Sequence, residues 1–375
     1  MSDRFYGATT LLCATALLAV VLTGSAPQIN EYGEEHAKVY EHEYDHELDK
    51  TYEYEHEKKH EFNYEFFAMD TVIMLTIYSN NKSEADMAAQ AAESEFRRLN
   101  DLSDRFAGEN LLEPGVSDVY RVNNAGGEWV KVSQDILEMV MLAIYYGEAS
   151  GGAFDIGIGA VSDLWGFRTS PRIPVDEELE GTLALGSFRD IEIDEGQGRI
   201  RIGKGAIMDL GGVAKGYATE SAAGILRGMG IEHGIINAGG NVYAIGAKPD
   251  GSPWKVGIRH PRDAQGVIAI VYVKDKAVVT SGDYEKYFEV DGQRYCHILD
   301  PKTGKPVVGA ASATIIDDSA FRADILSTTV FVLGRVAGEE FLNAEDGSPE
   351  ALFIDYGLNV SSTEGIADSV VIVQN

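Results

Sequence analysis

The chain has 375 residues, with 60 acidic and 31 basic side chains and a formal net charge of -29 at pH 7. This charge argues against nucleic-acid binding, which depends on neutralising phosphates with lysine and arginine. The length suffices for one large domain or two, and any phosphate-bearing ligand would need local lysines or a divalent cation to approach so acidic a protein.

An apolar run over residues 11–22 is followed by small residues. It is short for a membrane span and fits the core of a signal peptide. Leu22-Thr23-Gly24 resembles the start of a lipoprotein processing box, but Ser25 stands where the lipid-bearing cysteine would be. We therefore expect residues 1–26 to be a cleaved signal or an uncleaved membrane anchor without lipidation, and the protein to be exported to an extracytoplasmic location.

Residues 27–65 form an acidic segment of low complexity, rich in Glu, His and Tyr. Such a composition cannot bury enough apolar surface to fold alone. The segment holds five of the eight histidines, so weak metal binding is one interpretation and a solvated tether is the plainer one. We expect the folded domain to span residues 66–375, with order beginning near Phe66.

Within this domain, helices and strands follow one another in a mixed order. Apolar spacing predicts helices over residues 83–100, 133–149 (with Ser133 as N-cap), 214–229 and 323–333. Strand patterns cover 72–78, 199–208, 234–237, 242–246, 255–258, 267–273, 277–280, 295–299 and 311–316, and a hairpin joins 191–193 to 199–202. Hairpin-linked strands mixed with helices indicate an α+β fold and not a doubly wound parallel sheet.

The stretch from Asp209 to Ala218 joins a strand-like run to a helix and carries three glycines and Lys215. Glycine allows close backbone approach and positive φ, while the free N–H groups of a helix start favour an anion. Asp209 could accept hydrogen bonds or face a metal. These parts suit a phosphate-bearing ligand. A strand-to-helix turn that needs small residues for packing would have the same sequence pattern, and the glycine spacings of the Walker and dinucleotide-binding motifs are absent.

Other polar candidates follow further along the chain. Asp324 and Thr328 are four residues apart, so they share a helix face and offer the hard oxygen ligands that Mg²⁺ prefers; a capping aspartate at a helix start is the alternative. His297 lies in a predicted strand beside the turn at Asp300. Its two possible roles are a general base and a structural histidine. Cys296 is expected to be a small buried thiol and not a nucleophile.

Seven motifs in fixed order then resemble one known family, that of the FAD:protein FMN transferases (ApbE family). The resemblance covers residues from about 69 to about 333. Its motifs are Met69-Asp70-Thr71, Gly152-Ala153-Phe154-Asp155, Asp209 to Ala218, Asn237-Ala238-Gly239-Gly240-Asn241, Thr280 to Glu285, His297 to Gly304, and Ala323 to Thr328. In this family a T-fold-like α+β core binds FAD and Mg²⁺ and transfers FMN to a threonine or serine hydroxyl of a target protein, releasing AMP.

The resemblance also implies roles for individual residues. The flavin nucleotide would be bound by Met69, Phe106, Ala153, Phe154, Asp155, Asp209, Lys215 and Ile298. The metal would be held by Asp324, Thr328 and the carbonyl of Gly212, and His297 would be the base for the attacking hydroxyl. Asp70 departs from the pattern, because the family usually has glycine at that position.

This chemistry suits the residues present. Cleaving a pyrophosphate requires neutralising charge on two phosphates, which a divalent ion and Lys215 would supply. A hydroxyl is a poor nucleophile near neutrality, and a positioned base contributes about 10² to 10⁴ in rate. Two alternatives stay open: an FAD pyrophosphatase with water as the acceptor, and an exported FAD-binding protein without turnover. By resemblance, the acceptor would be a subunit of a membrane redox complex.

Overall fold

The computed structural model describes residues 59–107, 117–347 and 349–373. The predicted signal or anchor and most of the predicted tether lie outside these residues. In the described ranges, we find no helix with both the length and the apolar character needed to cross a bilayer.

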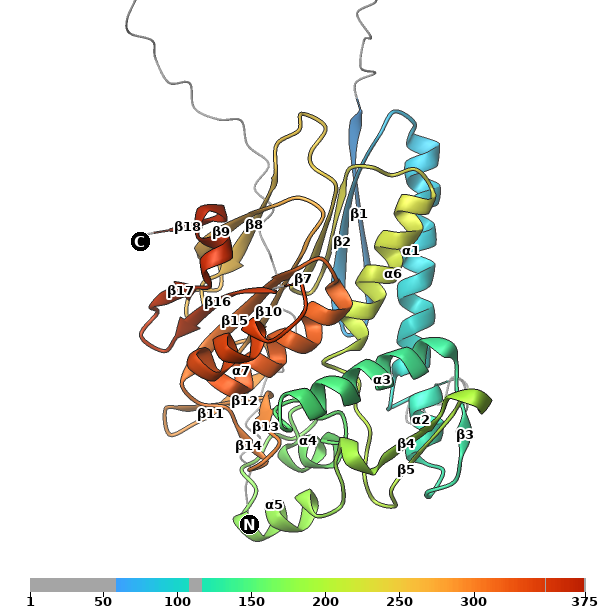
Figure 1. Cartoon of the computed structure of the whole chain (residues 1–375), viewed down its shortest axis with the longest axis vertical. Helices are drawn as coiled ribbons and strands as arrows, with labels where there is room; N and C mark the ends of the chain where they lie inside the picture. Colours follow the sequence, from blue (N-terminus) through green and yellow to red (C-terminus); the bar gives the residue numbers. More distant parts are fainter. Residues whose placement is uncertain (1–58, 108–116, 348, 374–375) are drawn as a thin grey trace, which may run out of the picture.

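The centre of the fold is an antiparallel sheet of eight strands in the order β1-β2-β6-β7-β10-β15-β16-β17 (Figure 1). Side chains alternate across it, so it buries two separate cores, one on each face. Its strands are β1 (His60–Ala68), β2 (Thr71–Ser79), β6 (Gly234–Ala238), β7 (Asn241–Ile245), β10 (Ala277–Gly282), β15 (Ala310–Asp317), β16 (Glu350–Asp355) and β17 (Val360–Ser362).

Three long helices cover one face of this sheet. They are α1 (Lys82–Ser103), α6 (Ala214–Gly228) and α7 (Ala320–Asn343), and α6 contacts both of the others (Figure 1). Ile73, Leu75 and Ile77 point from β2 into this core, and each is at most 2% exposed. The N-terminal ends of α6 and α7 meet beneath the same end of the sheet, which positions the site described below.

A second, smaller sheet covers the opposite face. It has the order β18-β9-β8, formed by β8 (Trp254–Arg259), β9 (Val267–Val273) and β18 (Val370–Ile372), and the short helix η3 (Glu364–Ser369) lies beside it. Val242 and Val278 of the main sheet pack against Val256 and Ile258 of β8 in the second core.

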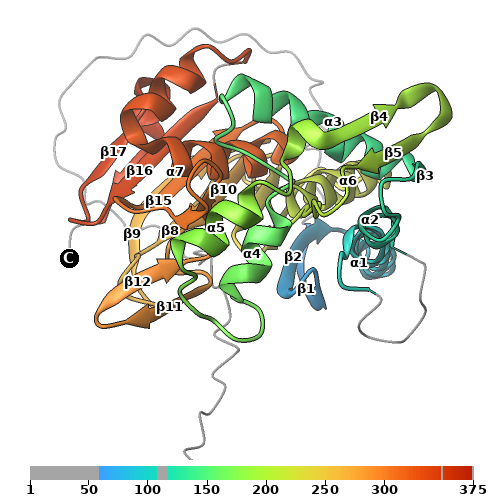
Figure 2. The same ribbon diagram turned by 90° about the horizontal axis from the view of Figure 1, so that it is seen from below.

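The remaining elements form the lower part of the molecule in Figure 1, and Figure 2 shows them from below. One group holds a three-stranded sheet in the order β3-β5-β4 beside α2 and α3, and a hairpin, β11–β12, packs with α4 and α5 around Trp165. The bounds are α2 (Asp118–Asn123), β3 (Val130–Lys131), α3 (Gln134–Ala149), α4 (Gly159–Trp165), α5 (Asp176–Leu183), η1 (Phe188–Asp190), β4 (Ile191–Asp194), η2 (Glu195–Gln197), β5 (Arg199–Ile202), β11 (Tyr287–Val290), β12 (Gln293–Cys296), β13 (Leu299–Asp300) and β14 (Lys305–Pro306).

The α+β class is confirmed, and so are most predicted elements. Ser133 is the N-cap of α3, with its hydroxyl accepting from the N–H of Ile136. Three boundaries were wrong. Order begins before Phe66, because β1 pairs with β2 from His60 onward and packs alternate, half-buried aromatic side chains against the core. The run over 199–208 ends as a strand at Ile202, and α7 is more than twice as long as predicted, with a break at Gly334.

Candidate active site

The predicted glycine turn is held firmly in place by its neighbours. The N–H of Asp209 donates to the carbonyl of Ile156 at 2.7 Å, and one Asp209 carboxylate oxygen accepts from the N–H of Gly211 at 2.8 Å. The other oxygen accepts from Arg105 Nε at 2.8 Å, and the same guanidinium binds Asp163. The Asp209 carboxylate therefore shapes the turn and neutralises a buried arginine.

Helix α6 starts directly after this turn, and its cap comes from another helix. Its N-cap residue, Val213, has no side-chain acceptor to offer. Instead, the Asp324 carboxylate of α7 accepts from the N–H of Gly216 at 2.8 Å, in the first turn of α6. Asp324 is thus a capping aspartate, which was the alternative to a metal ligand. It caps α6 and not its own helix, whose N-cap is Ser319.

Gly216 permits this contact by letting α6 and α7 approach closely. A Cβ atom at this position would lie 2.4 Å from the carbonyl oxygen of Ala320 and 2.5 Å from Cβ of Asp324. Neither Gly216 nor its neighbours Gly211 and Gly212 adopts positive φ. Of the two properties of glycine considered for this turn, positive φ is not used at these three positions; in Gly216 the missing side chain is what matters, as the alternative of a turn that needs small residues holds.

We expect Gly216→Ala to destabilise the protein by about 1–3 kcal/mol, because overpacking against backbone atoms cannot be relieved by rotating a side chain. Gly224→Ala is the matched control. It lies in the same helix, has nothing within 4 Å of its added Cβ, and should stabilise by up to about 1 kcal/mol through helix propensity. Urea unfolding midpoints of the two variants test this pair. Equal shifts in the two would contradict the packing argument.

The three predicted metal ligands lie around the junction of the turn and α7. Thr328 is one helical turn beyond Asp324, and its Oγ1 lies 3.2 Å from the hydroxyl of Ser281 at the end of β10. A Cβ at Gly212 would be 3.7 Å from Thr328 Oγ1, so the backbone of the turn runs beside this hydroxyl. The structure therefore brings Gly212, Asp324 and Thr328 together, with Ser281 as an additional oxygen.

His297 lies at the base of the β11–β12 hairpin. Its backbone N–H donates to the carbonyl of Lys286 at 2.9 Å, and its ring Nδ1 lies 3.2 Å from the same oxygen. Because a carbonyl oxygen only accepts, this contact places the proton on Nδ1 and leaves a lone pair on Nε2. The ring is half-buried; burial, together with the charges of Lys286 and Lys215, lowers the pKa of His297 to about 4.

Lys215 connects the parts of this site electrostatically. Its Nζ donates to the carbonyl of Gly211 at 3.1 Å, so the ammonium lies over the turn. Its charge lowers the pKa of His297, and Asp209 acts on the same ring in the opposite sense. The turn, Lys215 and His297 therefore lie close enough to influence one another electrostatically.

The Ala153–Asp155 motif lies beneath the turn. The Phe154 ring is buried and would be 3.3 Å from a Cβ at Gly212, so it supports the turn from below. Ala153 is buried, and its N–H donates to Ser150. The Asp155 carboxylate accepts from the N–H groups of Gly157 and Phe188, and burial raises the pKa of Asp155 to about 6.

The other predicted flavin-site residues are Met69, Ile298 and Phe106. Met69 and Asp70 form the two-residue β1–β2 turn with φ of 52° and 57°, and the N–H of Met69 donates to Asn100. The aspartate thus adopts the backbone that glycine would provide at this position. Ile298 is a core residue, 8% exposed. Phe106 lies under the guanidinium groups of Arg105 and Arg168, 4.1 and 4.0 Å from its ring centroid.

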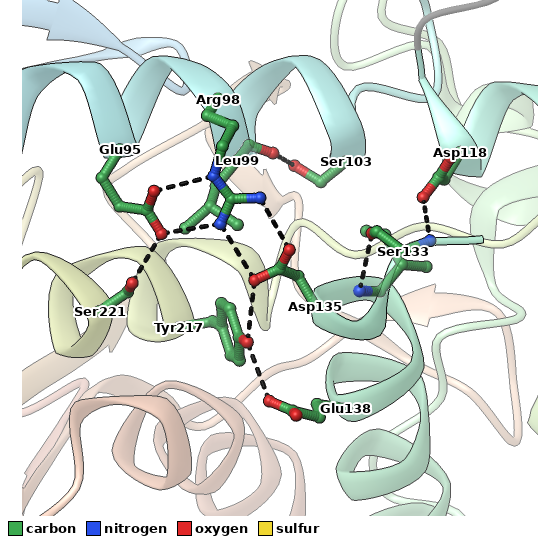
Figure 3. Close-up of polar contacts among 11 residues, drawn as sticks. Glu95, Arg98, Leu99, Ser103, Asp118, Ser133, Asp135, Glu138, Tyr217 and Ser221 are labelled. Carbon is green, nitrogen blue, oxygen red and sulfur yellow. Dashed lines mark hydrogen bonds and ion pairs between the residues drawn. The ribbon is translucent and has the colours of Figure 1, made fainter. Parts of the chain in front are cut away.

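A polar network behind the site fixes α6 relative to α1 and α3 (Figure 3). Arg98 of α1 pairs with Glu95 and Asp135, and it lowers the pKa of both carboxyls. Tyr217, next to Gly216, donates to Glu138 at 2.9 Å and to Asp135 at 3.1 Å. The first turn of α6 is therefore held from two sides, by Asp324 in front and by this network behind.

Comparison with known proteins identifies the family of the chain. The sequence profile of the ApbE family matches residues 69–353. The chain belongs to the ApbE family. It is 36% identical over 228 residues to the FAD:protein FMN transferase of Vibrio cholerae serotype O1, covering 59% of this chain and 68% of that protein. It is 32% identical over 276 residues to a Klebsiella pneumoniae protein of the same name, covering 72% and 82%.

Solved ApbE structures share the fold. The Thermotoga maritima ApbE protein superimposes with a TM-score of 0.75 at 32% identity, covering 83% of this chain and 99% of that one. The flavinyl transferase ApbE of Pseudomonas stutzeri gives a TM-score of 0.70 at 29% identity, covering 83% and 97%. The ApbE family match spans every predicted site residue from Met69 to Thr328.

Some residues at this ApbE site were not predicted from the sequence. Arg105 joins Asp209 from 104 residues away, and no local pattern reveals such a pair. Glu285 lies near both Lys215 and Arg259, although only Glu285 falls within a motif. The prediction for Cys296 is confirmed, because the thiol is 2% exposed and burial raises its pKa to about 11.

Proposed function

We propose that this protein transfers FMN from FAD to a threonine or serine hydroxyl of an acceptor protein, with release of AMP. The observation that supports this most directly is the convergence of the glycine turn, Lys215, the Asp324–Thr328 pair and His297 at one end of the sheet. The names of the related FAD:protein FMN transferases point to the same reaction.

The oxygens of Asp324, Thr328 and Gly212 fit a magnesium ion. They are hard donors from one carboxylate, one hydroxyl and one carbonyl, and Mg²⁺ is commonly held by one or two carboxylates together with substrate phosphates. One Asp324 oxygen is engaged with Gly216, which leaves the other for a ligand. Bound there, the ion would neutralise charge on the pyrophosphate of FAD.

The chain's own residues supply the other requirements. Lys215 adds a positive charge over the turn, where a pyrophosphate would otherwise meet a strongly acidic protein. His297 is neutral at physiological pH, and its Nε2 lone pair would take the proton of the acceptor hydroxyl as that oxygen attacks the FMN phosphorus. AMP then leaves on the side opposite the hydroxyl, as in-line displacement requires.

The test combines the protein, FAD, Mg²⁺ and a candidate acceptor, and weighs the acceptor by mass spectrometry. A mass gain equal to one FMN group, with one AMP released, supports the proposal. AMP release at the same rate without any acceptor would identify an FAD pyrophosphatase instead. Intact FAD after long incubation would identify a binding protein without turnover.

The pH dependence should report His297. Because its pKa is lowered, the base is neutral above about pH 4, and kcat/KM for FAD should fall only as pH drops through that value. The pH profile of kcat should also fall on the acidic side, but at a higher pH than that of kcat/KM. The reason is that the bound pyrophosphate stabilises the protonated ring and so raises its pKa. Initial rates between pH 3.5 and 8 measure both profiles, with buffer-matched stability controls. A kcat/KM limb at the ordinary histidine pKa would contradict the assignment.

We further propose that the enzyme acts outside the cytoplasm, on an acceptor subunit of a membrane redox complex. The apolar run over residues 11–22 and the acidic segment behind it support export and tethering. Fractionation of cells producing the full chain, with and without residues 1–26, tests the location. Recovery of the full chain in the cytoplasm would count against it.

A further inference from the structure

Glu285 is an acid at the site that the mechanism above does not use. It follows β10, close to the charges of Lys215, Lys286 and Arg259. Its carboxyl is half-buried, yet within the described part of the chain it forms neither a hydrogen bond nor an ion pair of ordinary length. An acid among three cations that pairs with none of them is available to a ligand.

A narrow crevice opens beside Glu285, between the main sheet and β8. It has a volume of about 30 Å³ and is lined by Gly240, Thr280 and Tyr284 together with Val256 and Ile258. Arg259 also lines it, and its buried Nε has no hydrogen-bond partner. The crevice is too small for a ring system but has room for one or two hydroxyl groups, each the size of a water molecule.

The position of His297 shows which half of FAD would lie here. The base must be beside the FMN phosphorus, since the hydroxyl it deprotonates attacks there. Glu285 directly precedes Lys286, whose carbonyl oxygen accepts from the backbone N–H of His297 at 2.9 Å and lies 3.2 Å from its ring Nδ1. Glu285 is therefore on the FMN side of the pyrophosphate, and AMP leaves on the other.

We propose that Glu285 and Arg259 bind the ribityl hydroxyls of the FMN half of FAD, and that they select a flavin nucleotide over other dinucleotides. This inference rests on the proposed function. A hydroxyl both donates and accepts, so it matches a carboxyl on one side and the unpartnered Arg259 N–H on the other. Burial raises the pKa of Glu285 to about 7, and either protonation state can bond a hydroxyl.

The experiment measures binding of FMN and of AMP separately, by calorimetry with Mg²⁺ present, to the wild-type protein and to Glu285→Ala. We expect the variant to weaken FMN about 10-fold and to leave AMP within about twofold. Glu285→Gln keeps hydrogen-bonding capacity and should bind FMN within about threefold of wild type. An FMN analogue with an unsubstituted alkyl chain in place of ribityl should bind the wild type more weakly and be insensitive to Glu285→Ala.

Each outcome decides the assignment. Weakened AMP with unchanged FMN would place Glu285 on the adenosine side and overturn the proposal. So would equal loss of FMN and of its alkyl analogue, because the ribityl hydroxyls would then not be the groups recognised. A wild-type protein that binds both ligands but never forms AMP from FAD would refute the proposed function, while the FMN measurements would still decide the role of Glu285.

Discussion

Replacing Asp324 with alanine is expected to lower the rate of FMN transfer by at least about 10³-fold, the effect of removing several kcal/mol of charge stabilisation in the transition state. Asp324 is the only carboxylate in the proposed magnesium set. Without it, Thr328 and the Gly212 carbonyl provide no negative charge to hold the ion. The measurement is the transfer rate as a function of Mg²⁺ concentration. Full transfer at an unchanged metal requirement would refute the metal assignment.

A control is needed because Asp324 also caps α6. Alanine removes the acceptor for the buried N–H of Gly216, which costs about 1–3 kcal/mol of stability on its own. Asp324→Asn retains an oxygen that can accept this hydrogen bond but removes the charge. We expect the asparagine variant to unfold near the wild-type urea midpoint and still to lose most activity. If it regains activity along with stability, Asp324 is structural only.

Replacing His297 with alanine should leave FAD binding nearly intact and reduce transfer by about 10² to 10⁴, the usual contribution of a positioned base. Binding should survive because Lys215, the turn and the α7 oxygens do not depend on the ring. Equilibrium titration of flavin fluorescence measures the first quantity, and single-turnover formation of flavinylated acceptor measures the second.

The control for this variant is chemical rescue. Added imidazole can enter the space left by the ring and accept a proton, so it should restore part of the rate without changing FAD affinity. Lost binding combined with normal turnover at saturating FAD would instead give His297 a structural role. Failure of imidazole to rescue a variant that binds FAD normally would also weaken the assignment as a base.

Much of the local structure around this site could be predicted from the sequence, because it follows from patterns among residues that are close together in the chain. Helix periodicity placed Asp324 and Thr328 on one face, and the glycine-rich junction marked the start of α6. Alternating strands with hairpin turns indicated the α+β class. These signals depend on neighbours within a few residues, and the structure confirms them.

What could not be predicted depends on distant pairs. The hydrogen bond by which Asp324 caps α6 joins two residues that are 108 positions apart, and no sequence pattern near either residue predicts it. Composition misled at β1, where glutamates and a histidine suggested a solvated tether, although the aromatic residues between them alternate and pack against the core. The reason for glycine at position 216 could not be predicted either, because the close neighbour that requires it comes from another helix.

The double attachment of Asp324 limits how this enzyme could be altered. One side-chain oxygen accepts from the N–H of Gly216, and in the proposed metal site the other would bind the cation, so lengthening the residue to glutamate would displace one of the two. A substitution at position 324 that alters the preference for a metal would consequently also alter the stability of the fold. Attempts to retune the ion should begin at Thr328, whose hydroxyl faces Ser281 and supports no helix start.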